Sequence, residues 1–180
     1  MKFERAFKFV IGEEGGFTDD PNDRGNWTGG ATGKGELLGT KYGIAANAYG
    51  CALMAAGKII KELTIADAME IYRRDWWNKM FCDSLPDKYR LPLFSAAINC
   101  GMTRAVKWLQ GCIGVVADGR VGEKTIQAAR KTNPDAALNE FYALWLSHYD
   151  AIVQRNPSQK KYLKGWQNRV RHTKAENMNV

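Results

Sequence analysis

A glycine-rich stretch from residue 24 to residue 43 most constrains what this chain can fold into. It reads RGNWTGGATGKGELLGTKYG and holds seven glycines. Glycine inside a helix or strand costs roughly 0.5–1 kcal/mol relative to alanine, so this stretch is unsuited to a regular element. We predict a long loop or an irregular β-hairpin, and a loop of such length within a small domain is usually functional.

The residues before this stretch predict an amphipathic helix that carries an acid. At about 100° per residue, one face of the helix holds Phe3, Phe7, Val10 and Glu14. The glycine pair at 15–16 predicts the helix end. Burial and the helix dipole both raise the pKa of a carboxyl in this place, which suits a general acid. Glu14 is the candidate acid; the alternative is a polar residue at a frayed helix end.

A second group of acids follows in a turn. Asp19 and Asp20 precede Pro21 and Asn22 there, and Asp23 follows them. Glycoside hydrolysis uses two carboxyl groups in unlike environments, one protonated to donate to the leaving oxygen and one ionised to handle water or the sugar cation. The pattern therefore favours a glycosidase.

The rest of the chain predicts a mainly α protein. We expect helices over 44–61, from a capping box at Thr64 and Asp67, after Thr103, from about Glu123, over 134–155, and in a last basic segment around Trp166. Pro86 and Pro92 bracket the polar sequence DKYRL, which we interpret as a link between lobes. The expected lobes are residues 1–90, catalytic, and residues 91–180, helical.

Charge is uneven along the chain, whose net charge is +7. Residues 1–30 hold four basic and six acidic residues, whereas residues 151–180 hold seven basic and one acidic. This asymmetry predicts a catalytic front and a basic tail attracted to polyanions. For the tail we favour an anionic envelope surface, the alternative being a plain solvated helix. No nucleic-acid recognition motif is present, so nucleic acid is not an expected partner.

Cysteine usage argues against a metal site. No pair among Cys51, Cys82, Cys100 and Cys112 has C-x-x-C spacing, and the two histidines are distant in sequence. We expect buried free thiols and neither metal nor cofactor. No apolar run is long enough for a membrane span and the N-terminus lacks a signal peptide, which predicts synthesis in the cytoplasm.

An ordered set of motifs resembles glycoside hydrolase family 108, the phage-type muramidases. The set is Glu14-Gly15-Gly16, Asp20-Pro21-Asn22-Asp23, the run from Gly39 to Ile44, and Ile71-Tyr72-Arg73-Arg74-Asp75. The second half is similar to the predicted peptidoglycan-binding domain that usually follows, through Ala105–Gln110, Asp118–Gly122, Thr125 and Gly165-Trp166.

The resemblance implies a lysozyme-like helical fold and hydrolysis of the β-1,4 bond between N-acetylmuramic acid and N-acetylglucosamine in peptidoglycan. It implies that Glu14 is the catalytic acid, and it matches Asp23 and Thr40 to an aspartate and a threonine used by related lysozymes. An insertion separates the two motif halves, so Thr28 keeps the spacing from Asp23 and remains an alternative. Trp27, Tyr42 and Asn99 are candidate substrate contacts, although Trp27 and Tyr42 could equally pin the loop to the core.

The resemblance also implies a role in phage-driven host lysis, by a monomer held in the host cytoplasm until its release to the periplasm or cell wall. A lytic transglycosylase also relies on a glutamate and is one alternative. A non-catalytic peptidoglycan-binding module is another. Whether the reaction inverts or retains configuration depends on the carboxyl separation, roughly 6.5–9.5 Å against roughly 5–5.5 Å.

Overall fold

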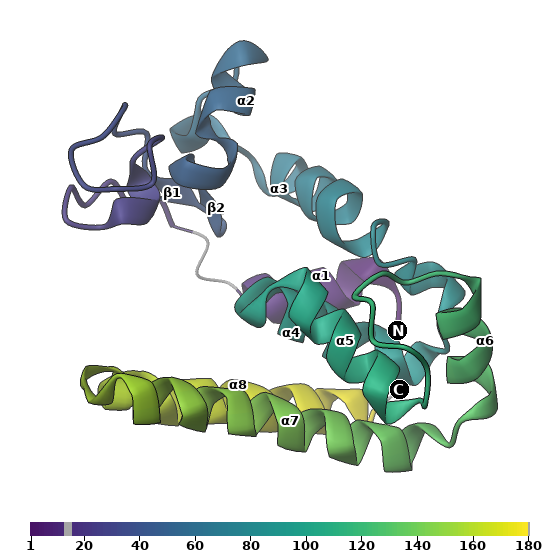
Figure 1. Cartoon of the computed structure of the whole chain (residues 1–180). Helices are drawn as coiled ribbons and strands as arrows, with labels where there is room; N and C mark the ends of the chain where they lie inside the picture. The colour runs from purple at the N-terminus through teal and green to yellow at the C-terminus, as the bar shows by residue number, and fades with distance from the viewer. Residues whose placement is uncertain (13–15, 180) are drawn as a thin grey trace. The chain divides into compact units, whose positions relative to one another are not determined.

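The chain is mainly helical with one small antiparallel sheet, as the sequence predicts (Figure 1). The computed structural model describes residues 1–12 and 16–179. The α-helices are α1 (Phe3–Ile11), α2 (Cys51–Ala55), α3 (Ile65–Tyr72), α4 (Asp87–Cys100), α5 (Met102–Cys112), α6 (Glu123–Lys131), α7 (Pro134–Arg155) and α8 (Lys160–Asn177). The strands are β1 (Thr40–Lys41) and β2 (Ile44–Ala45). Short 3-10 or π turns are η1 (Arg24–Asn26), η2 (Ala46–Gly50), η3 (Ile60–Glu62), η4 (Arg73–Trp77), η5 (Cys82–Ser84) and η6 (Pro157–Gln159).

Two compact units make up the chain, and each is described by itself. Unit 1 comprises Met1–Ala6 and Arg74–Val180, and unit 2 comprises Phe7–Arg73. The sequence analysis placed its boundary between residues 90 and 91, which lies inside α4. The functional assignment of the two halves stays a prediction.

Helix α1 ends earlier than the glycine pair at 15–16 suggests. The residue after Ile11 is Gly12, which has φ +68° and donates its N–H to the Lys8 carbonyl at 3.0 Å. Glycine adopts positive φ without steric cost, so Gly12 terminates the helix. Phe3 and Phe7 are buried as predicted, whereas Glu14 lies outside the described residues.

In unit 2, a two-residue hairpin joins β1 to β2. Thr40 pairs with Ala45 and Lys41 with Ile44. The two turn residues have positive φ, +52° at Tyr42 and +74° at Gly43, as a type I′ turn requires. The predicted irregular hairpin in the glycine-rich stretch is therefore confirmed.

The helix expected over residues 44–61 is wrong. That stretch forms β2, the π turn η2, the five-residue α2 and the 3-10 turn η3. Gly57 has φ +68° just after α2, which explains why the helix ends there.

The capping box at the start of α3 is confirmed. The Thr64 hydroxyl accepts from the Asp67 N–H at 3.2 Å, and the Asp67 carboxylate accepts from the Thr64 N–H at 2.9 Å. Lys58 donates to the same carboxylate at 2.6 Å. These donors, Lys58 first, hold the pKa of Asp67 well below its usual range. Tyr72, at the other end of α3, is buried against Phe7 with ring centroids 5.6 Å apart.

In unit 1, α4 is almost entirely buried and forms the centre of the core. Phe94 from this helix packs edge-on against Trp77 at 5.4 Å and against Phe3 at 6.0 Å between ring centroids. Trp77 is fully buried in this core. The polar link expected between Pro86 and Pro92 is wrong, since these residues begin a helix.

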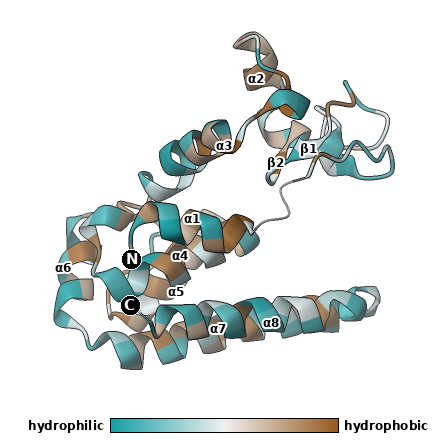
Figure 2. Ribbon diagram, turned by 180° about the vertical axis from the view of Figure 1, so that it is seen from behind, coloured by the Kyte–Doolittle hydropathy of each residue, from teal (hydrophilic) through white to brown (hydrophobic). Residues whose placement is uncertain are grey.

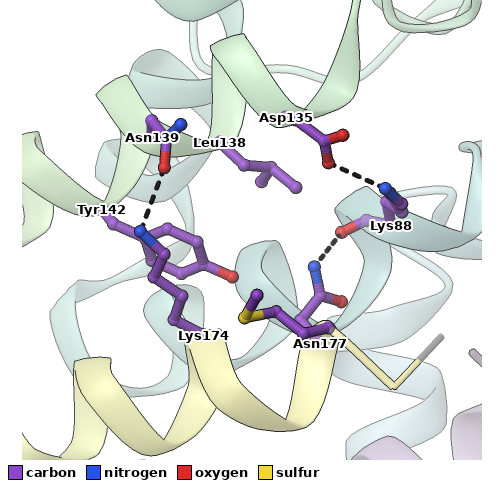
Figure 3. A pocket seen from close by; sticks show the side chains of 8 residues that line it. Lys88, Asp135, Leu138, Asn139, Tyr142, Lys174 and Asn177 are labelled. Atoms are coloured by element: carbon purple, nitrogen blue, oxygen red, sulfur yellow. Dashed lines mark hydrogen bonds and ion pairs between the residues drawn. The ribbon is translucent and has the colours of Figure 1, made fainter.

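Helix α4 continues through Pro92 because another helix supplies the missing donor. Proline has no N–H, so the carbonyl four residues earlier, at Lys88, loses its intrahelical partner. The side chain of Asn177, near the end of α8, donates its Nδ2 to that carbonyl at 2.9 Å (Figure 3). Asn177 is buried, so the bond is shielded from water. Sequence alone does not reveal this compensation, because the two residues are 89 positions apart.

A buried glutamine organises the turn after α5. Gln110 donates Nε2 to Asp118 Oδ1 at 2.8 Å and to the Arg120 carbonyl at 2.9 Å, and its Oε1 accepts from the Gly119 N–H at 2.8 Å. The same amide nitrogen is 3.2 Å from the Thr125 hydroxyl. The Asp118–Gly122 motif is therefore a turn that the buried side chain of Gln110 stabilises.

Helices α7 and α8 lie side by side and pack on α4 and α5. Figure 2 shows hydrophilic residues along much of the α7–α8 pair, in keeping with the basic composition of the last thirty residues. All four cysteines are free thiols, as predicted, but only Cys82 and Cys100 are buried; Cys51 is exposed and Cys112 is half-buried. Within the described residues, no helix is long and apolar enough to cross a membrane, and no cluster of His, Cys, Asp and Glu could hold a metal ion.

Candidate active site

The acidic turn of unit 2 is shaped by its own carboxylates. Asp20 Oδ1 accepts from the backbone N–H of Asn22 at 2.9 Å, and Asp23 Oδ1 accepts from the N–H of Gly25 at 2.8 Å. Asp23 thereby caps η1, a role that aspartate favours because its side chain satisfies the free N–H groups at a helix start. Both carboxylates are exposed, so they can meet a substrate.

Asn26 connects this turn to the hairpin. Its side chain is fully buried and donates Nδ2 to the Asp20 carbonyl at 3.0 Å. Its Oδ1 accepts from the Thr40 hydroxyl at 2.7 Å, and its carbonyl accepts from the N–H groups of Leu38 and Gly39. One buried amide therefore holds the Asp20–Asp23 turn against the start of β1.

The sequence analysis missed Asn26. The available signal was an amide residue three positions after Asp23 within the glycine-rich stretch, a place where a polar side chain can satisfy loop backbone groups.

Thr40 and Thr28, the two candidate threonines, have different partners. Thr40 is half-buried and is joined through Asn26 to the segment that carries Asp23. The Thr28 hydroxyl instead accepts from the Glu36 N–H at 2.9 Å, inside the irregular hairpin that pairs Trp27 with Leu37. The geometry brings Thr40, and not Thr28, into the hydrogen-bond network of the acidic turn.

Trp27 and Tyr42 both hold the loop in place. The Trp27 indole donates Nε1 to the Pro21 carbonyl at 2.9 Å, and the Tyr42 carbonyl accepts from the Tyr72 hydroxyl at 3.2 Å. Burial raises the pKa of Tyr72 to about 12, so this hydroxyl remains a donor at neutral pH. Trp27 and Tyr42 are both half-buried, and Lys41 Nζ lies over the Tyr42 ring, 5.4 Å from its centroid.

Two glycines permit the backbone to pass close to neighbouring groups. A Cβ at Gly43 would lie 2.5 Å from the Tyr72 hydroxyl oxygen, and one at Gly39 would lie 2.5 Å from the Phe17 ring. Both residues also have positive φ. The motif from Gly39 to Ile44 therefore encodes a tight hairpin fitted against Tyr72 and Phe17.

The remaining candidates are Asn99 and Glu14. Asn99 belongs to unit 1, on α4, where its Nδ2 donates to the Ser95 carbonyl at 2.7 Å and its Oδ1 accepts from Arg169. Glu14, the candidate acid, lies outside the described residues, so its role stays a prediction.

Comparison with known proteins identifies the family. Residues 7–101 match Glycosyl hydrolase 108, and residues 104–171 match the Predicted Peptidoglycan domain. The first match covers more than half of the chain. The chain belongs to the glycosyl hydrolase 108 family. This family-108 protein is therefore a glycoside hydrolase that acts on peptidoglycan.

A solved structure shows a similar fold. The family-108 chain aligns with the structure of Brucella abortus SagA at a TM-score of 0.74 and 31% sequence identity, over 98% of this chain and 94% of SagA. The predicted mainly α, lysozyme-like fold is confirmed. The comparison with curated protein sequences found no match.

Proposed function

We propose that this chain is a muramidase that hydrolyses the β-1,4 bond between N-acetylmuramic acid and N-acetylglucosamine. The observation that carries the proposal is the linked group of Asp23, Asn26 and Thr40 inside the segment that matches the hydrolase family. An exposed carboxylate is suited to orienting water or stabilising a sugar cation, and the Thr40 hydroxyl is joined to the segment that carries Asp23 through Asn26.

In the proposed mechanism, Glu14 protonates the glycosidic oxygen. The Asp23 carboxylate stabilises the oxocarbenium-like state or orients the attacking water, and Thr40 helps to hold that water. In this proposal the half-buried Trp27 and Tyr42 contact the sugar rings of the substrate. Each role uses a group on this chain and needs no proton donor from outside it.

The test of the catalytic acid compares two neighbouring glutamates. Glu14→Gln keeps the size of the side chain but removes its acid function, and general acid catalysis contributes roughly 10²–10⁴-fold to rate. We expect the release of soluble fragments from purified cell-wall sacculi to fall by about that factor. Glu13→Gln is the matched control and should retain activity. Wild-type clearing by Glu14→Gln would refute the assignment.

Product analysis tests the reaction type. A muramidase leaves hydrated reducing ends on its products, whereas a lytic transglycosylase leaves an anhydro ring on the muramoyl sugar. Mass spectrometry of digested peptidoglycan separates the two. Anhydro products would replace the muramidase proposal with the transglycosylase.

We further propose a role in phage-driven host lysis, supported by the family resemblance. In this role a monomeric enzyme, held in the host cytoplasm, reaches the periplasm or wall after the membrane opens, and its basic α8 attracts it to anionic envelope surfaces. Expression inside bacteria should leave cells intact until a pore-forming agent is added. Lysis without that agent would contradict this part of the proposal.

A further inference from the structure

A pocket lies in unit 1, and Asn99, one of the candidate substrate contacts, is among the residues that line it. It has a volume of about 400 Å³ and opens where the end of α4 and the start of α5 meet α7 and α8. Its polar lining comprises Asn99, Arg104, His148, Arg155 and Arg169, and Trp166 adds an aromatic wall. This size is sufficient for a small ligand.

The ionised side chains that line this pocket are all positively charged. Arg104 comes from α5, Arg155 from α7 and Arg169 from α8, while no aspartate or glutamate lines the pocket. Within the described part of the chain, none of the three guanidinium groups is in an ion pair. Three cations that converge without a counter-ion attract an anion.

Neutral acceptors hold the arginine side chains in place. Arg104 donates Nη1 to the Cys100 carbonyl at 2.7 Å, Arg155 donates Nε to the Ala151 carbonyl at 3.1 Å, and Arg169 donates to Asn99 Oδ1. A guanidinium has five N–H donors, and these bonds use only some of them. Donors therefore remain for a ligand.

The pKa of His148 reflects the positive electrostatic potential of the same arginines. Its Nε2 lies 3.3 Å from Arg104 Nη1, and since arginine only donates, this nitrogen is the unprotonated one. Burial, followed by the charges of Arg104 and Arg155, holds the pKa of His148 below its ordinary value. A bound anion would oppose this effect.

The aromatic wall favours an organic anion over a bare ion. Trp166 stacks on Tyr149 with ring centroids 5.1 Å apart and on Tyr162 at 5.9 Å. This stack presents flat apolar surface beside the guanidinium groups, which suits a ligand with carbon atoms next to its charge.

We propose that this pocket binds the free carboxylates of peptidoglycan peptide stems, a proposal that depends on peptidoglycan being the substrate as stated above. Arginine pairs with carboxylate through two parallel hydrogen bonds, so three arginines on three helices can bind more than one carboxylate. The pocket would thereby add recognition of the peptide to recognition of the glycan.

Isothermal titration calorimetry with the full chain tests the proposal. The probes are a muramoyl peptide with free carboxyl groups, the same peptide with its carboxyl groups amidated, and inorganic phosphate. We expect the free acid to bind at least about tenfold more tightly than the amide, as a charge-assisted bond implies. Equal affinity for acid and amide, or tighter binding of phosphate, would overturn the proposal.

Two variants test the site. The first is a double variant that combines Arg155→Gln with Arg169→Gln, and the second, Arg171→Gln, is the control. Arg171 lies on α8 outside the pocket lining, so its replacement removes one positive charge and an exposed hydrogen bond to Asn168 without changing the pocket lining. The double variant should lose the preference for the acid, and the control should keep it. If the double variant unfolds, Arg155→Gln alone should lower affinity for the acid at least threefold. An equal loss in Arg171→Gln would show a general charge effect and refute the site.

A local readout comes from the His148 ring, observed by NMR. Addition of the free-acid peptide should raise its pKa, and addition of the amide should leave it unchanged. The muramoyl peptide contains no cleavable glycosidic bond, so these measurements are independent of catalysis. Loss of activity in Glu14→Gln with equal binding of acid and amide would reject the pocket alone, and the reverse result would reject the catalytic assignment alone.

Discussion

The Thr40 hydroxyl donates to the buried Oδ1 of Asn26 at 2.7 Å. Replacement of Thr40 by valine keeps the shape of the side chain and leaves this oxygen without its donor. We expect a loss of about 1–3 kcal/mol in the free energy of unfolding, measured by urea denaturation, and reduced sacculus hydrolysis. Thr28→Val is the control, since among the described residues the Thr28 hydroxyl bonds to Glu36 within the hairpin that pairs Trp27 with Leu37. A larger loss of hydrolysis in Thr28→Val would identify Thr28 as the site threonine.

Alanine variants at Gly43 and Gly33 separate the stability cost of backbone strain from that of steric conflict. Both have positive φ, +74° and +75°, but only at Gly43 would a Cβ approach the Tyr72 oxygen, whereas nothing lies within 4 Å at Gly33. Gly33→Ala should cost about 1–2 kcal/mol from the left-handed backbone alone. Gly43→Ala should cost more, as measured by thermal unfolding.

Removal of the Tyr72 hydroxyl should rescue part of this loss. Tyr72→Phe in the Gly43→Ala background relieves the conflict, so the double variant should be more stable than additivity predicts. Equal costs at Gly33 and Gly43 would contradict the close approach of the hairpin to Tyr72.

Gln110 is expected to stabilise the folded state. Gln110→Met keeps the volume but removes the donors and acceptor that hold the Asp118–Arg120 turn, so the free energy of unfolding should fall by about 2–4 kcal/mol. Gln127→Met on α6 is the matched control, because Gln127 is exposed and bonds only to Glu123. Similar small effects in both variants would mean that the turn forms without Gln110.

His148 makes stability depend on pH in a defined direction. Its folded pKa lies below the ordinary value of 6.5, so the unfolded chain binds more protons as pH falls through 6.5. The stabilisation is complete above pH 6.5 and is lost as pH falls toward the folded pKa. His148→Gln should remove this part of the slope in chemical unfolding measured between pH 5 and pH 8. An unchanged slope would contradict the depressed pKa.

The outline of the fold could be predicted from local sequence signals. The Thr64–Asp67 capping box, Pro134 at a helix start and the Asn156-Pro157 stop each act within a few residues, and the helix bounds agree with them. The family motifs likewise predict a hydrolase from the sequence alone.

Features that depend on distant partners could not be predicted. Pro92 normally ends or kinks a helix, and only the position of Asn177 shows why α4 continues. Asn26 is fully buried in a stretch whose composition indicates an exposed loop. Gly12 terminates α1 although the glycine pair at 15–16 gives a stronger signal, because a single positive-φ residue is sufficient.

The bond from Asn177 to Lys88 also bears on the order in which the chain can fold during translation. Lys88 leaves the ribosome 89 residues ahead of the amide that satisfies it. At roughly 5–20 residues per second, its carbonyl must rely on water for about 4–18 seconds of synthesis. Unit 1 can therefore reach its native packing only after Asn177 has been synthesised.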